Sequence, residues 1–246
     1  MTIFRIVTSL VRDIQMMGAP RVTPLVERGF PHDPRAFTQG LAYRDGMLYE
    51  STGLRNASSL RRIDPSNGAI LEELPVEGVF AEGIAFLEGR IYQLTWKDRR
   101  YLVYDILPLR LVGGGSIDHD GWGIAGEGQW LYVTDGSSLI RRYDGVMRVR
   151  NTARARLAGI RLCHLNDIEV VRDRLYANVW RTPFIAEVRL PAGVVTRIID
   201  CGNLCNRERS GDRNSIMNGI AFNPDNGTFF VTGKRWRQYY EISLPD

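Results

Sequence analysis

The sequence has little cysteine, almost no lysine and no long hydrophobic run. Three cysteines in 246 residues are too few for a disulfide framework and too scattered for a zinc ribbon. Cys201 and Cys205 could form one disulfide bond or remain free thiols. No apolar run approaches the roughly 18 residues that a membrane-spanning helix needs. The apolar stretch 6–11 is also shorter than the apolar core of a signal peptide, about 7 to 15 residues. A disulfide-rich domain and a membrane-spanning protein are thereby excluded.

The excess of positive over negative charge is also small. The 32 basic and 28 acidic residues leave a net charge of +4, and this small excess is not gathered in one stretch. Because nucleic-acid binding needs a concentrated basic face, we expect no nucleic-acid partner. His32, His119 and His164 stand in different connections without metal-ligand spacing, so we expect no metal and no cofactor. Only Lys97 and Lys234 are lysines, and burial can tune the pKa of a lysine but not of an arginine.

The sequence does contain an internal repeat. With 44% hydrophobic and 24% charged residues, its composition is that of an ordinary globular protein, and its length suits one domain. Each repeat has an alternating run, a turn and a second β-branched or aromatic run, which are strand signals. A period of about 40 to 45 residues is typical of β-propeller blades. The five repeats begin 43, 40, 44 and 52 residues apart, at residues 39–49, 82–92, 122–132, 166–176 and 218–230.

Five repeats predict an all-β fold, a five-bladed β-propeller. The last repeat ends before an outer strand, and the apolar segment 22–30 could supply that strand and close the ring. We therefore expect one propeller domain over residues 22–246. Residues 1–21 are expected to be an extension, disordered or the remnant of a signal. The arginine-rich segment 149–162 is expected to be an exposed outer strand and loop.

Equivalent positions of the repeats should form rings around the central channel. Two rings fall near one mouth of the channel, and their residue types are unusually mixed for a structural position. Tryptophan supplies rigid walls, amides supply donors and acceptors, and a single glutamate and a single lysine supply acid–base capacity. The rings therefore predict a small pocket for a polar group. Their members are Gln39, Glu82, Trp122, Asn166 and Asn218, and then Gly53, Trp96, Gly136, Trp180 and Lys234.

Each of these residues also has an ordinary structural interpretation. A tryptophan is more often part of the core, Glu82 could be a buried carboxylate paired with an arginine, and Lys234 could lie on the surface. The coincidence of all of them in one register favours the pocket.

Nine ordered motifs resemble the plant-type glutaminyl-peptide cyclotransferases, the glutaminyl cyclases of plants and bacteria. They extend from about residue 22 to the end of the chain, and their order and separations match. The motifs occupy residues 31–41, 49–53, 80–83, 93–96, 121–123, 165–169, 177–180, 218–221 and 231–234.

This resemblance implies a five-bladed propeller that converts the N-terminal glutamine of peptides or proteins into pyroglutamate and releases ammonia. Glu82 and Lys234 match the catalytic pair of the family. The family's substrate pocket corresponds to Gln39, Trp96, Trp122, Asn166 and Trp180, with Phe37, Phe80 and Asn218 nearby. The resemblance also implies a metal-independent enzyme that is exported to the periplasm or secreted, although a cytoplasmic location stays open. A monomer is expected only because it is the default for a closed ring.

The chemistry fits these residue types. A carboxylate whose pKa is raised by apolar neighbours can act first as base and then as acid. Lys234 could stabilise the developing oxyanion. The sequence departs from the family pattern at Ala81, where glycine is common, and at Asp167, where glutamate is common, and neither change removes a proposed group.

Two other functions fit the repeat. In a calcium-dependent hydrolase of the lactonase kind, Glu82, Asn166, Asn218 and Gln39 would be oxygen ligands. A single carboxylate and a neighbouring lysine oppose a bound cation. An interaction propeller without enzymatic activity would bind through exposed loops, and the concentration of Glu, Lys and Trp at the channel mouth argues against it.

Overall fold

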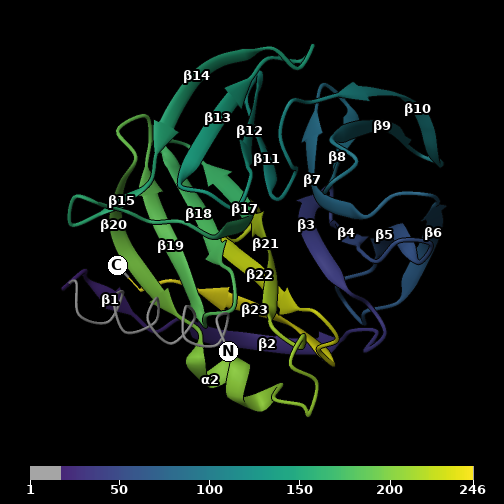
Figure 1. The fold of residues 1–246 in the computed structure, drawn as a ribbon. Coiled ribbons are helices and arrows are strands. Elements are labelled where there is room, and N and C mark those ends of the chain that lie inside the picture. The colour runs from purple at the N-terminus through teal and green to yellow at the C-terminus, as the bar shows by residue number, and fades with distance from the viewer. Residues whose placement is uncertain (1–17, 246) are drawn as a thin grey trace.

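The computed structural model describes residues 18–245, and its strands form sheets arranged around a central axis (Figure 1). The innermost strands contact one another in turn and close a ring: β3 (Thr38–Arg44), β7 (Ala81–Leu87), β11 (Ile124–Glu127), β17 (Leu165–Val171) and β21 (Met217–Asn223). Each inner strand begins at one of the sequence repeats. The repeat therefore marks the strand that lines the axis.

Four of the sheets are regular blades of four strands each. The first contains β3, β4 (Met47–Thr52), β5 (Ser58–Ile63) and β6 (Ile70–Val76). The second contains β7, β8 (Arg90–Thr95), β9 (Arg100–Ile106) and β10 (Leu109–Ser116). The third contains β11, β12 (Trp130–Thr134), β13 (Leu139–Tyr143) and β14 (Val149–Arg154). The fourth contains β21, β22 (Thr228–Gly233), β23 (Gln238–Ser243) and β2 (Leu25–Pro31).

The remaining sheet has seven strands and a different construction. Its antiparallel part is β17, β18 (Arg174–Val179), β19 (Phe184–Arg189) and β20 (Val194–Asp200). Three two-residue strands extend it: β1 (Arg21–Val22) and β15 (Arg156–Leu157) pair in parallel with β20, and β16 (Ile160–Arg161) pairs with β15. These short strands cover the outer edge of β20, which would otherwise be open to pairing with another chain.

The prediction of a five-bladed propeller closed by an N-terminal strand in the last blade is therefore wrong in that form. Four sheets are regular blades, and the fifth is an irregular seven-stranded sheet. The N-terminal segment does not complete one blade alone, because β2 pairs with β23 while β1 pairs with β20. The irregular sheet could not be predicted from the sequence, because two-residue strands are too short to show a period. The predicted extension 1–21 lies largely outside the described residues.

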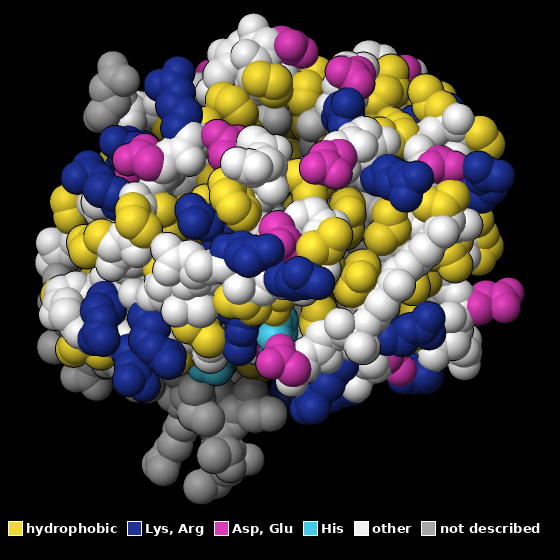
Figure 2. All heavy atoms as spheres, turned by 90° about the horizontal axis from the view of Figure 1, so that it is seen from above, with side chains coloured by type: hydrophobic (Ala, Val, Ile, Leu, Met, Phe, Trp, Pro, Cys, Tyr) yellow, Lys and Arg dark blue, Asp and Glu magenta, His cyan; other side chains and the backbone are white. Residues whose placement is uncertain are grey.

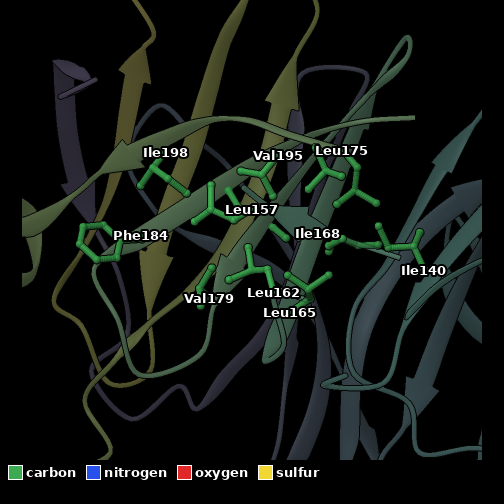
Figure 3. Close-up of a cluster of buried hydrophobic side chains, with 14 of the residues drawn as sticks. Ile140, Leu157, Leu162, Leu165, Ile168, Leu175, Val179, Phe184, Val195 and Ile198 are labelled. Atoms are coloured by element: carbon green, nitrogen blue, oxygen red, sulfur yellow. The ribbon is translucent and has the colours of Figure 1, made fainter. Parts of the chain in front are cut away.

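The largest buried hydrophobic cluster lies on the seven-stranded sheet (Figure 3). Leu157 and Leu162, from the connection after β14, pack against this sheet, and Ile140 joins them from the neighbouring blade. The arginine-rich segment is thus only partly exposed: β14 is mostly exposed, but the connection that follows it contributes these two core leucines.

The surface shows no concentrated basic face in the view of Figure 2, where Lys and Arg side chains are spread among Asp and Glu. Cys163, Cys201 and Cys205 are free thiols, so the alternative of a bridge between the last two is not realised. In the part of the chain from residue 18 to residue 245, no helix is long and apolar enough to cross a membrane.

Candidate active site

β-Bulges lie at four of the five first-ring positions, close to the channel mouth. The pairing register shifts between Thr38 and Gly40 in β3, and between Ala81 and Ile84 in β7. The same shift recurs at the start of β17 and of β21. A bulge bends its strand and turns a side chain away from the regular alternation. The shifts coincide with four ring members: Gln39, Glu82, Asn166 and Asn218.

These side chains border a cavity of about 230 Å³ at the mouth of the channel. All but one of the predicted site residues line it, and Asn218 lies behind Gln39 instead. The cavity is bordered by Phe37, Gln39, Phe80, Glu82, Trp96, Trp122, Asn166, Trp180, Arg181, Asn214, Ile216 and Lys234.

Aromatic rings form most of the wall. The Phe80 ring lies edge-on to Phe37, with centroids 6.3 Å apart, and to Trp96, at 5.5 Å. Trp122 and Trp180 form a further edge-on pair at 5.9 Å. Edge-on pairs of this kind hold rings in fixed orientations. The pocket walls are therefore rigid and apolar.

Two glycines of the second ring make room for these aromatic side chains. A Cβ atom on Gly53 would come within 2.6 Å of the Phe80 ring, and one on Gly136 within 2.7 Å of the Trp122 ring. No real Cβ tolerates such contacts. The two glycines at positions equivalent to Trp96 and Trp180 are therefore part of the pocket's construction.

Glu82 is the acidic group of the cavity and is almost completely buried. Its carboxylate accepts a hydrogen bond from Nε2 of Gln39 at 3.0 Å. Burial raises the pKa of the Glu82 carboxyl well above its usual range, and attraction to Lys234 opposes this only partly. A carboxyl with a raised pKa can exchange a proton near neutral pH.

Lys234 is a buried cation of the cavity, with only 5% of its surface exposed. Burial lowers the pKa of its ammonium group to about 8, against the opposing attraction of Glu82. The Nζ atom lies 4.7 Å from the centre of the Phe37 ring. Its backbone N–H donates to the carbonyl of Ile216 at 2.8 Å, which fixes the residue beyond the end of β22.

Amide side chains complete the polar part of the site. Nδ2 of Asn218 donates to Oε1 of Gln39 at 3.2 Å, and Gln39 in turn donates to Glu82. Asn218 therefore positions Gln39 rather than bordering the cavity. Oδ1 of Asn166 is buried and has no hydrogen-bond partner within residues 18–245. An unsatisfied acceptor at the cavity wall is ready to bind a donor on a ligand.

Comparison with known proteins agrees with this geometry. The family model of glutamine cyclotransferase matches residues 2–244. The chain belongs to the glutamine cyclotransferase family. It is 37% identical over 224 residues to the glutaminyl-peptide cyclotransferase of Arabidopsis thaliana, covering 87% of this chain and 69% of that protein. The crystal structure of Myxococcus xanthus glutaminyl cyclase superposes with a TM-score of 0.87 at 27% identity, over 92% of this chain and 98% of that chain. The predicted family resemblance, and with it the prediction of an enzyme, is confirmed.

Three residues that border the cavity were not predicted from the sequence of this cyclotransferase. Arg181 directly follows Trp180, and its guanidinium lies 4.8 Å from the centre of that ring. Asn214 and Ile216 come from the long connection before β21, which has no counterpart in the other repeats. Position next to a ring member could have indicated Arg181, but no signal in the sequence indicates the other two.

The geometry differs from the ordinary structural interpretations of Glu82 and Lys234. Glu82 has an amide as its hydrogen-bond partner, not an arginine, and Lys234 is not on the surface. His164 lies beside Trp180, with ring centroids 6.0 Å apart, and does not border the cavity. Within residues 18–245, no three His, Cys, Asp or Glu side chains converge as a metal site would require.

Proposed function

We propose that Glu82 and Lys234 carry out the glutaminyl cyclisation to which membership of the glutamine cyclotransferase family points. One observation carries the proposal: a buried carboxyl with a raised pKa shares an aromatic pocket with a buried lysine and three amides. Such a pocket suits the short, uncharged side chain of glutamine and the amine beside it.

In the proposed reaction Glu82 acts twice. It first accepts a proton as the α-amine nitrogen bonds to the side-chain amide carbon, Cδ, of the same glutamine. It then returns that proton to the amide nitrogen as the C–N bond breaks, and ammonia leaves. A positioned group that transfers protons in this way contributes about 10²- to 10⁴-fold to the rate.

The other polar groups have defined parts in this proposal. The Lys234 ammonium faces the oxygen that becomes negatively charged when the amine attacks. The free acceptor Oδ1 of Asn166 receives an N–H of the substrate, and Gln39 holds the Glu82 carboxyl in place. The rigid aromatic walls restrict the substrate to conformers in which the amine and the amide carbon Cδ are close, which supplies much of the acceleration of an intramolecular reaction.

The proposal includes a reaction without metal or cofactor, because the two protein groups account for both proton transfers and for the charge. The resemblance to an exported family supports action in the periplasm or after secretion, and a ring of sheets has no need of a partner subunit. Cell fractionation and sedimentation velocity of the purified protein test location and monomeric state.

The test of the function is cyclisation of a short peptide that begins with glutamine. Wild-type protein should remove 17 Da from the peptide, the mass of ammonia, and release ammonia in equal amount, with and without EDTA. An N-acetylated copy of the peptide is the control, because its blocked amine cannot attack. Absence of ammonia release by folded protein would refute the cyclase, and loss of activity in EDTA would refute the metal-free mechanism.

A further inference from the structure

A second cavity, of about 560 Å³, adjoins the catalytic pocket. The two cavities share the side chains of Arg181 and Ile216, so a chain that leaves the first can enter the second directly. The second cavity is bordered by Arg181, Thr182, Pro183, Gly202, Cys205, Asn206, Arg209, Ser215, Ile216, Met217 and Trp236.

The wall of this cavity is largely built by the longest interval between the repeats. The last two repeats begin 52 residues apart, whereas the others are separated by 40 to 44. The additional residues form the short helix α2 (Gly202–Arg207) and the segment that leads from it to β21 (Figure 1). This connection supplies Asn214 and Ile216 to the catalytic pocket as well. It therefore shapes both cavities at once.

The cavity presents donors that nothing in the described chain satisfies. Nε of Arg181 and Oγ of Ser215 are both buried, and neither has a hydrogen-bond partner within residues 18–245. A buried donor without a partner costs about 1 to 3 kcal/mol, so such groups usually mark the place of a ligand or a water. Acceptors of a peptide, its carbonyl oxygens above all, fit both atoms.

The charge of the lining is of one sign. Arg181 and Arg209 border the cavity, and no aspartate or glutamate does. The nearest acidic residues in sequence are already engaged: Glu208 accepts hydrogen bonds from Tyr240 and from Arg237, and Asp212 pairs with Arg235. The positive charge of the cavity is thus left for a ligand.

We propose that this second cavity binds the residues that follow the N-terminal glutamine of the substrate, and that it favours an acidic side chain among them. The inference rests on the proposed cyclase function, because it requires the glutamine to occupy the first cavity. The peptide leaves the pocket between Arg181 and Ile216, its carbonyl groups meet the free donors, and a carboxylate is placed between Arg181 and Arg209.

The test compares matched peptides in ammonia-release assays. The set consists of glutamine amide and of Gln-Ala-Ala-Ala amides in which Glu, or its uncharged analogue Gln, replaces one alanine at a time. We expect kcat/KM to rise from glutamine amide to the tetrapeptides. At the best position Glu should exceed Gln by about fivefold, and this preference should shrink in 0.5 M NaCl because salt screens exposed charges.

Variants outside the catalytic pocket separate the two cavities. Arg209→Gln should reduce the preference for Glu to about twofold, and Ser215→Ala should lower kcat/KM for the tetrapeptides by about threefold. Both should leave turnover of glutamine amide unchanged. The matched control is Arg99→Gln, because Arg99 is also an exposed arginine, pairs with Asp120 and borders neither cavity.

The outcomes distinguish this inference from the function on which it rests. Equal kcat/KM for Glu and Gln at all three positions would overturn the acidic preference. If Arg99→Gln reduces the preference for Glu as much as Arg209→Gln does, the preference comes from the general surface charge of the protein and not from binding at this cavity. Failure of folded wild-type protein to turn over glutamine amide would instead refute the cyclase itself.

Discussion

Glu50 and Glu82 lie on neighbouring blades and are about equally buried, with 0% and 5% of their surfaces exposed, yet their pKa values move in opposite directions. Burial alone would raise the pKa of both carboxyls. At Glu50 this rise is outweighed by attraction to His32 and Arg61 and by hydrogen bonds from His32 and Thr38, which hold its pKa below the usual range. At Glu82 the pKa is well above that range.

The partners explain the difference. Nε2 of His32 and Oγ1 of Thr38 lie 2.9 and 2.7 Å from Oε1 of Glu50, and an Arg61 nitrogen lies 3.5 Å from the other oxygen. Glu82 accepts one hydrogen bond, from an uncharged amide. One glutamate is thus held as a permanent anion that joins strands, and the other is left able to change its protonation. Depth of burial does not distinguish a reactive carboxyl from a structural one, but its partners do.

The largest expected effect is on activity, from Glu82→Gln. We expect kcat to fall by about a thousandfold, because the amide can neither accept nor return a proton. The free energy of unfolding should change by only about 1 kcal/mol, since glutamine can still accept the hydrogen bond from Gln39. Ammonia release and urea unfolding measure the two quantities. A variant with more than a tenth of wild-type activity would show that Glu82 is not the general base.

Replacement of Lys234 tests whether the two groups act together. Lys234→Met should lower kcat by about a hundredfold, as expected for a lost oxyanion donor. It should also move the acidic limb of the kcat/KM profile to higher pH, because the lysine charge lowers the pKa of Glu82. The control is Lys97→Met, which removes an exposed lysine that pairs with Asp120. An acidic limb that does not move would show that the charge of Lys234 does not affect the pKa of Glu82.

Glu50→Gln is the converse experiment and should affect stability instead of chemistry. Breaking a buried ion pair costs about 3 to 5 kcal/mol, so the free energy of unfolding at pH 7 should fall by about that amount. The folded pKa of Glu50 is lowered, so its contribution is present above the ordinary pKa of 4.5 and disappears as pH falls through the folded value. The gap between wild type and variant in urea unfolding should therefore close below pH 4. Below its unfolding temperature, Glu50→Gln should have the same kcat/KM as the wild type. A variant that is stable but inactive would contradict this prediction.

The sequence predicted which residues meet at the channel mouth, but it did not predict the form of the sheets. The repeats located the inner strands. Four inner strands carry a first-ring residue at their start, and Trp122 lies just before β11, so the register of the repeats brought Glu82, Trp122 and Asn166 to one mouth. The hydrogen-bond partners of a carboxyl depend on contacts between blades, such as that between Gln39 and Glu82. The repeat pattern contains no information about these contacts. The seven-stranded sheet escaped prediction for a similar reason, since β1, β15 and β16 are defined only by the strand that they join.

The smallest expected effect concerns Asp167, which occupies a ring position that is glycine in the other four repeats. Its Oδ2 atom accepts hydrogen bonds from the backbone N–H groups of Leu41 and Ile220, at 3.1 and 2.9 Å, and Oδ1 has no partner within residues 18–245. Asp167 thus joins three inner strands beneath the catalytic pocket. Burial also raises the pKa of the Asp167 carboxyl well above its usual range. When it is ionised, its charge contributes to the raised pKa of Glu82.

Asp167→Asn keeps the acceptor for both N–H groups and removes the ionisable carboxyl. We expect the acidic limb of kcat/KM to move to lower pH by less than about one unit, with kcat within about threefold of wild type, because burial rather than this charge is the main cause of the Glu82 shift. Asp167→Gly, which removes the acceptor too, should lower the free energy of unfolding by about 2 kcal/mol or more, since two buried N–H groups lose their partner. A limb that moves to higher pH in Asp167→Asn would mean that Glu82 responds to its neighbours in the opposite sense. Neighbouring charges would then no longer explain why the pKa values of Glu82 and Glu50 move in opposite directions.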